Sequence, residues 1–266
     1  MTGVTDPGKM RAENEDNIAT FPAIGLAVLA DGMGGHQAGE VASRIAVDVV
    51  SRHFQEIFNR HSTSGGNGKS LEQRAITKAI ELANAAIYEM AHQRPECAGM
   101  GSTVVVAVFY GDTICIGHVG DSRLYRLRGG KLEQLTQDHS VIEELVARGL
   151  LSREEARQTI GKNLVTRALG IDPFVAADVT ELPREANDLY LICSDGLNDV
   201  VPDPDIEGLL ASGSQEELWP LAQRLVATAN ERGGPDNISV ILVRPGERFE
   251  REAPAAPASS PDAEFR

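Results

Sequence analysis

Four apolar runs along the chain are of strand length, and each meets an aspartate at one end. The runs cover residues 26–30, 114–119, 189–193 and 238–243, and the adjoining aspartates are Asp31, Asp121, Asp195 and Asp236. Short apolar runs bounded by glycine, serine or proline are typical of buried strands. The pattern therefore predicts several core strands that each present a carboxylate where the strand meets a turn.

Carboxylates fixed at strand ends are suitable ligands for a hard divalent cation, because Mg²⁺ and Mn²⁺ prefer oxygen donors and keep several waters. A single Asp-Gly pair is more often a plain turn. Four aspartates in the same setting favour a metal site over four unrelated turns.

The remaining pattern predicts helices and hairpins. Apolar residues recur at helical spacing over residues 41–57 and 76–87, and a cap at Ser214 to Glu217 begins a third helix. Tight glycine turns join strand-like runs at 103–109 and 113–119, and at 122–127 and 131–135, and further strands are expected at 174–182 and 188–193. Hairpins imply antiparallel sheets, so we expect an α+β fold in which helices cover the outer faces of stacked sheets.

The domain organisation is expected to be simple. Residues 1–245 show no internal linker and predict one domain, whereas the Pro- and Ala-rich residues 246–266 predict a disordered tail. Residues 139–170 lack strong apolar periodicity and fall between two of the aspartate-bearing runs. They are either a mobile insertion beside the site or a plain surface excursion.

Composition narrows the functional classes. With 25 basic and 39 acidic residues the formal charge is −14, which argues against nucleic-acid binding and against a polybasic membrane patch. No apolar stretch is long enough to span a bilayer. The chain has three cysteines, Cys97, Cys115 and Cys193, and the last two lie in apolar runs of strand length. We therefore expect a cytoplasmic protein without disulfides.

Six short segments carry a family resemblance that covers the chain from about Asp6 to Val243. They are Arg11–Asp16, Ala30–His36, Gly101–Thr103, Val119–Arg123, Ser194–Gly196 and Gly234–Ile238. In this order they closely resemble the bacterial form of the metal-dependent type 2C protein serine/threonine phosphatases.

The resemblance implies a four-layer sandwich of two antiparallel β-sheets flanked by pairs of helices, with two or three Mn²⁺ or Mg²⁺ ions. The implied metal ligands are Asp31 (bridging), the Gly32 carbonyl, Asp195 and Asp236, with Asp121 at a third site. The implied outer positions are Glu15, Asp16 and Asn237; Arg11 matches the phosphate-binding arginine, and residues 139–170 match a variable flap. Animal members have a histidine, often assigned as the general acid, where Met33 stands here. His36 is the nearest substitute in sequence and is a weak candidate for this role.

The implied activity is hydrolysis of phosphoserine and phosphothreonine in proteins by direct attack of a hydroxide that bridges the metals. Such an enzyme would oppose a bacterial Ser/Thr kinase, and we expect a monomer. Two alternatives stay open at this point. One is a catalytically silent regulatory binding module, and the other is a phosphatase of small phosphorylated metabolites.

Overall fold

The fold is a sandwich of two antiparallel sheets. The computed structural model describes residues 1–35, 37–59, 70–152, 155 and 164–246. The first sheet has the order β1 (Thr2–Asp6), β11 (Ile238–Val243), β10 (Leu189–Cys193), β7 (Arg123–Arg128) and β8 (Lys131–Gln134). The second has the order β2 (Asp16–Phe21), β3 (Leu26–Met33), β5 (Val104–Tyr110), β6 (Thr113–Val119) and β9 (Asp178–Pro183), and the short β4 (Gly101–Ser102) pairs with the end of β3.

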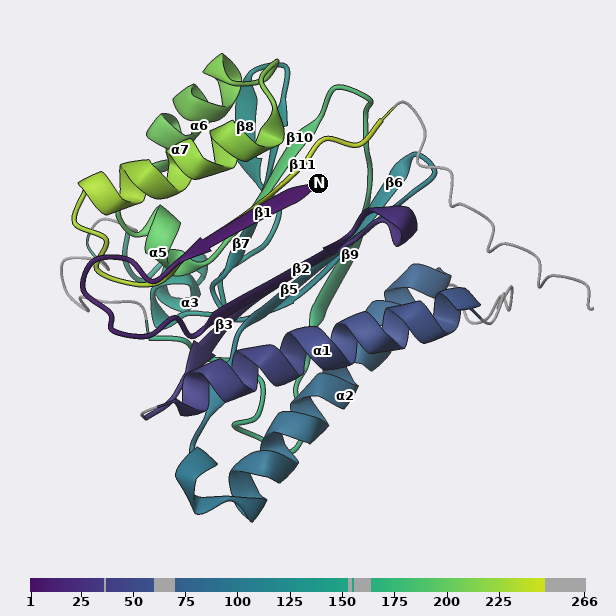
Figure 1. Cartoon of the computed structure of the whole chain (residues 1–266), viewed down its shortest axis with the longest axis vertical. Helices are drawn as coiled ribbons and strands as arrows, with labels where there is room; N and C mark the ends of the chain where they lie inside the picture. Colours follow the sequence, from purple (N-terminus) through teal and green to yellow (C-terminus); the bar gives the residue numbers. More distant parts are fainter. Residues whose placement is uncertain (36, 60–69, 153–154, 156–163, 247–266) are drawn as a thin grey trace, which may run out of the picture.

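Helices cover both outer faces of the sandwich (Figure 1). The long helices α1 (Ala38–Asn59) and α2 (Leu71–Gln93) lie on the second sheet, and α6 (Asp203–Ser212) and α7 (Leu218–Glu231) lie on the first. The shorter elements are α3 (Val141–Ala147), α5 (Asp195–Asn198), η1 (Pro22–Ile24) and η2 (Pro95–Cys97). The predicted α+β sandwich with helices on its outer faces is confirmed.

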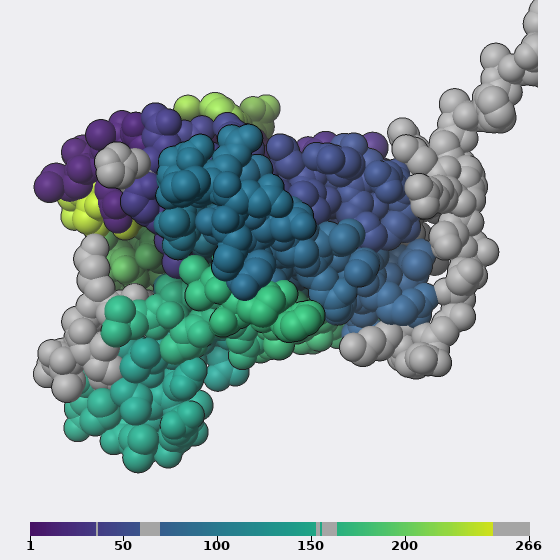
Figure 2. Space-filling view, turned by 90° about the horizontal axis from the view of Figure 1, so that it is seen from below, coloured from purple at the N-terminus to yellow at the C-terminus, as the bar shows by residue number. Residues whose placement is uncertain are grey.

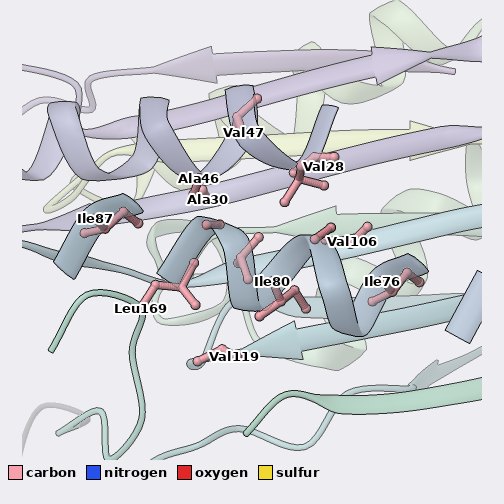
Figure 3. Close-up of a cluster of buried hydrophobic side chains, with 14 of the residues drawn as sticks. Val28, Ala30, Ala46, Val47, Ile76, Ile80, Ile87, Val106, Val119 and Leu169 are labelled. Carbon is pink, nitrogen blue, oxygen red and sulfur yellow. The ribbon is translucent and has the colours of Figure 1, made fainter. Parts of the chain in front are cut away.

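Three apolar layers hold the four structural layers together. Successive residues of β3 alternate between two of them, because side chains of a strand point to opposite faces. Val28 and Ala30 pack against α1 and α2 (Figure 3), whereas Ala27 and Leu29 face the first sheet. A third cluster lies between the first sheet and helices α5, α6 and α7. Burial on both faces explains why the core strands are continuous apolar runs in the sequence.

Several local predictions were wrong in their boundaries. The strand expected from Phe174 begins only at Asp178, and the Phe174 side chain is 89% exposed. Helix α7 has its N-cap at Glu217 and receives no side-chain cap, so the cap predicted to begin at Ser214 does not form. The sequence pattern also missed β1, β2 and α6. The polar loop at residues 60–69, position 36 and the tail from residue 247 lie outside the described residues.

All three cysteines are buried and free, and Cys115 and Cys193 lie in strands as predicted. Burial raises the pKa of Cys115 to about 12, because the thiolate would lose its hydration. Within the part of the chain that the structure describes, no helix is long and apolar enough to cross a bilayer.

We predict that Gly117→Ala lowers the free energy of unfolding by about 1–3 kcal/mol, as overpacking of a filled core does. A Cβ at Gly117 would lie 2.1 Å from the Ile76 Cγ2 atom of α2, so the helix and β6 would be forced apart. Urea denaturation measures the change. The control is Gly208→Ala in α6, where a Cβ meets nothing within 4 Å and where alanine should stabilise the helix. Equal effects of the two substitutions would contradict this account of the packing.

Candidate functional site

A hollow of about 310 Å³ opens at one end of the sandwich, where the layer between the two sheets ends. Its lining includes eight of the ten residues predicted from the sequence: Arg11, Glu15, Asp31, Gly32, Asp121, Asp195, Asp236 and Asn237. Asp16 lies behind this wall, and His36 is outside the described residues. Thr103 and Val165 also line the hollow. Thr103 belongs to one of the six segments that carry the resemblance but was given no role, and the sequence did not point to Val165.

Asp31 continues the alternation of β3 and therefore faces the layer between the sheets. Its backbone is fixed from both sides: its N–H donates to Thr103 Oγ1 at 3.1 Å, and its carbonyl accepts from the Thr103 N–H at 2.8 Å and from Ser102 Oγ at 2.9 Å. The position of the Asp31 carboxylate is thus fixed by the strand, because Asp31 does not lie in a flexible loop.

Asp16 and Asp31 are direct cross-strand partners on β2 and β3. Because opposed residues of an antiparallel pair share one face, their carboxyl groups are close neighbours. Asp16 is buried, and its Oδ2 accepts a hydrogen bond of 2.8 Å from Ser194 Oγ of the other sheet. Ser194 in turn precedes Asp195 at the start of α5, so this contact joins both carboxylate-bearing strand ends.

The loop between β1 and β2 carries Arg11 and Glu15 and is held by the side chain of Asn237. Asn237 Oδ1 accepts from the Glu15 N–H at 2.8 Å, and its Nδ2 donates to the carbonyls of Pro7 and Glu13 at 3.0 and 2.9 Å. Both N–H donors of the Asn237 side chain and one lone pair of its Oδ1 are therefore used by protein partners. Its contacts indicate that it positions this loop, which curves around the end of the sandwich in Figure 1.

Two glycines allow backbone segments to meet beside Glu15. A Cβ on Gly32 would lie 2.0 Å from the Gly39 carbonyl oxygen, and a Cβ on Gly39 would lie 2.3 Å from Glu15 Oε1. Because neither position has room for a side chain, the first turn of α1 lies directly on the end of β3. This contact explains why glycine is needed on both sides of the turn that follows Asp31.

Arg11 lies at the rim of the hollow, where its Nη2 donates to Asp236 Oδ2 at 2.8 Å. The arginine side chain is 48% exposed. A guanidinium carries five N–H donors in a planar fork, so donors beyond the one bound to Asp236 can reach a phosphate oxygen. Arg11 and Asp236, which are 225 residues apart, thus form one pair at the mouth of the site.

Asp121 is buried at the turn after β6, and this turn contacts the loop after β8 that carries Asp138 and His139. The N–H of Gly120 donates to His139 Nδ1 at 3.0 Å. That loop is fixed by a buried ion pair in which Arg123 Nη2 donates to Asp138 Oδ2 at 2.6 Å. Gly120 has a φ of +106°, a conformation that favours glycine, which allows the chain to turn sharply into Asp121.

The carboxyl groups at the hollow have strongly perturbed acidity. The pKa of Asp31 and of Asp195 is raised well above the usual range for aspartate. Burial is the largest cause, and repulsion from neighbouring carboxylates adds to it. Burial raises the pKa of Asp16 and of Asp121 to about 6, and it also raises the pKa of Glu15. These upward pKa shifts mean that the ionised form of each carboxyl group is destabilised unless a positive charge lies nearby.

The donor set fits a cation site. Glu15 Oε1 and Asp16 Oδ1 are buried oxygen atoms without a hydrogen-bond partner, which is uncommon in protein interiors. No three of these carboxylates, all of them among the described residues, place their oxygen atoms all within 4.8 Å of one another. They surround the hollow without meeting at a single point, which suits more than one ion with intervening waters, as Mg²⁺ and Mn²⁺ usually require.

A second group, His118, His139 and Asp178, does bring three possible ligand atoms within 4.8 Å. His139 Nδ1 must be unprotonated to accept from Gly120, which leaves the proton on Nε2, 3.3 Å from Asp178 Oδ2. His118 Nε2 must carry a proton to donate to the Gln137 carbonyl at 2.8 Å. A cation bound to His139 Nε2 would require this nitrogen to be unprotonated. The ring proton would then lie on Nδ1, which could no longer accept the hydrogen bond from the Gly120 N–H. These contacts therefore favour a hydrogen-bonded support for the Asp121 turn over a metal site.

Comparison with known sequences identifies a family and several bacterial relatives. The profile described as protein phosphatase 2C matches residues 11–242. The chain is 38% identical over 242 residues to the serine/threonine phosphatase stp of Listeria welshimeri, covering 90% of this chain and 93% of that protein. It is 36% identical over 238 residues to the serine/threonine protein phosphatase PstP of Mycobacterium tuberculosis, covering 90% of this chain and 43% of that protein.

Solved structures show the same fold. The Mycobacterium tuberculosis PstP structure has a TM-score of 0.80 at 35% identity and covers 91% of this chain and 96% of its own. The catalytic domain of PstP in complex with two manganese ions has a TM-score of 0.77 at 36% identity, covering 91% of this chain and 95% of its own.

We predict that Mn²⁺ or Mg²⁺ raises the melting temperature by on the order of 5 °C at about pH 7.5 and by much less at about pH 5. Aspartates whose pKa is raised on folding stabilise the protein when protonated. That stability is present below about pH 4 and is lost as pH rises past about pH 6. A bound cation offsets this loss only where the carboxylates are ionised.

Differential scanning fluorimetry with each ion and with excess chelator measures this effect. Asp195→Asn should reduce the ion-induced shift. Asp112→Asn, at the opposite end of the sandwich between β5 and β6, should leave it unchanged. An equal shift at both pH values would argue against the carboxylate cluster as the binding site.

Proposed function

The chain belongs to the protein phosphatase 2C family, and from this membership we propose that it hydrolyses phosphoserine and phosphothreonine in proteins, with Mn²⁺ or Mg²⁺ as cofactor. The observation that carries the proposal is the hollow that combines buried carboxylates with an exposed guanidinium at its rim. Carboxylates bind the cations, and the guanidinium is suited to a phosphoryl group.

In this proposal Asp31, Asp195, Asp236 and the Gly32 carbonyl hold two cations, and Asp121 with Asp195 holds a third. When bound, the cations supply Lewis acidity, which makes water nucleophilic near neutral pH and withdraws charge from the phosphoryl oxygens. Asp16 and Glu15 orient the waters around them, because each has an unpartnered buried oxygen near the hollow.

Arg11 binds the phosphoryl oxygens of the substrate and offsets the charge that they carry during transfer. Asn237 is a positioning residue, because its three hydrogen bonds fix the loop on which Arg11 stands. Met33, which stands where animal relatives have a histidine, cannot donate a proton. The leaving group must therefore take its proton from another source.

We further propose that residues 1–245 form the catalytic domain, that residues 139–170 form its flap, and that residues 246–266 form a tail. The protein would act as a monomer in the bacterial cytoplasm, against a Ser/Thr kinase that shares its substrates, and without nucleic-acid or membrane partners. A silent binding module is the weaker proposal, because a protein without catalysis does not need to keep five carboxylates in one hollow. Hydrolysis of small phosphorylated metabolites is distinguished by substrate preference.

The proposed activity predicts Mn²⁺-dependent phosphate release from a phosphothreonine peptide, little release from a phosphotyrosine peptide, and none with excess chelator. Asp195→Asn should reduce release to background, because it removes a proposed ligand while conserving side-chain volume. The matched control is Asp112→Asn, which should retain full activity. Full activity of Asp195→Asn would remove this residue from the site, and strong preference for a free metabolite would favour the small-molecule alternative.

Arg11→Ala should raise KM for the phosphopeptide by about tenfold or more, because a charge-assisted hydrogen bond to phosphate is lost. Asn237→Ala should raise KM less and should lower the free energy of unfolding by about 2 kcal/mol, because three backbone groups lose their partner. Steady-state kinetics and urea denaturation measure these effects, with Asn187→Ala on the surface as control. An Asn237→Ala protein of full stability and unchanged KM would contradict the positioning role.

A further inference from the structure

A second hollow of about 400 Å³ lies beside the aspartate hollow, and the two share Met33 and Val165 in their walls. Their chemistry is opposite. The first hollow is lined by carboxylates and Arg11, whereas seven of the ten residues that line the second are apolar. A ligand that reaches both must carry a phosphate and, next to it, an apolar group.

Large apolar side chains are exposed at the second hollow and close to it. Phe174 is 89% exposed and Ile171 is 50% exposed, and both line this hollow. Leu164, next to the shared Val165, is 61% exposed. Among the described residues seven large apolar side chains are exposed, and three of them fall within residues 164–174. Such a concentration of exposed apolar surface is typical of a binding site.

The segment that forms this hollow is firmly anchored. The buried Asn84 of α2 accepts from the Gly170 N–H at 2.8 Å and donates to the Asp172 carbonyl at 3.0 Å. Leu169 packs in the cluster beneath α2, close to Ile87 in Figure 3, and its backbone pairs with Ser102. The exposed side chains therefore project from a backbone that is fixed to the core.

The far side of the same segment is fixed by Arg167. Its Nη1 donates to the Ala176 carbonyl at 2.9 Å and to Asp178 Oδ1 at 2.8 Å, so its charge is paired within the protein. Figure 2 shows the green segment around residues 165–180 between α2 and a projecting teal lobe. The hollow is therefore pre-formed. Because the charge of Arg167 is already paired within the protein, this arginine does not need a ligand to satisfy it.

We infer that this second hollow, lined by Met33, Val165, Ile171 and Phe174, binds an apolar side chain of the substrate polypeptide, from a residue close in sequence to the phosphorylated one. The inference rests on the proposed phosphatase function and adds sequence preference to it. Adjacent residues of an extended chain are about 3.3–3.6 Å apart along the chain. Because the two hollows share a wall, a residue one or two positions from the phosphothreonine can reach the second hollow while its phosphate occupies the first.

The test compares phosphothreonine peptides that carry only glycine and serine around the phosphothreonine with peptides that place leucine at one of the two positions on either side. For at least one position we expect kcat/KM to rise by about tenfold, in keeping with transfer of an apolar side chain into a partly open pocket. Phe174→Ser and Ile171→Ser should each reduce this ratio toward one, whereas Phe174→Leu should largely preserve it. Trp219→Ser, a 50% exposed aromatic residue on α7, should leave both the ratio and the activity unchanged.

The outcomes separate the two hypotheses. Equal hydrolysis of all peptides by the unsubstituted protein, or a ratio that Phe174→Ser leaves unchanged, would overturn the subsite while leaving the phosphatase intact. Failure to hydrolyse any peptide would overturn both. If Phe174→Ser changes the sedimentation coefficient and leaves the ratio unchanged, this face is a contact between copies of the chain, and the subsite is overturned.

Discussion

Carboxylates held close together and away from water repel one another more strongly than they do in solution, and the rest of this structure is arranged around that repulsion. The pKa values of Asp31 and Asp195 rise because the protein surrounds these groups without supplying a positive charge in their midst. Arg11, the guanidinium that lines the hollow, is at the rim and is paired with Asp236. The hollow is consequently a place where divalent cations relieve the repulsion between ionised carboxylates, and the same cations supply the chemistry of the reaction.

Such a cluster needs a scaffold that cannot relax by moving the charges apart. Asp16 and Asp31 are fixed as cross-strand partners in one sheet, and Ser194 ties Asp16 to the other sheet. Asp31 has its backbone held on both sides by Ser102 and Thr103. The well-packed layer between the sheets makes the distance between these strand ends resistant to change. Rigidity of the sandwich and geometry of the site are therefore the same property.

The sequence predicted the parts of this arrangement that depend on local pattern. An apolar run that is buried on both faces, such as β3, identifies a core strand and the aspartate at its end. The sequence could not reveal the role of Asn237, because its partners Pro7, Glu13 and Glu15 lie more than 220 residues away. The strand expected from Phe174 failed because β-propensity does not distinguish a buried aromatic residue from an exposed one. The local pattern singled out the four aspartates, whereas the other site residues and the individual roles came from a family resemblance. The structure adds how eight of the ten predicted residues are brought to one hollow.

The pairing of the first strand with the last has a consequence for synthesis of the protein. β1 lies against β11, and the loop that follows β1 carries Arg11 and Glu15 into contact with Asp236 and Asn237. During translation the amino-terminal segment leaves the ribosome first, yet its partners are among the last described residues to be made. Closing so long a loop is slow, and the nascent chain has no complete active site until nearly the whole domain has emerged. The nascent chain therefore cannot hydrolyse its substrate before β11 has left the ribosome and paired with β1.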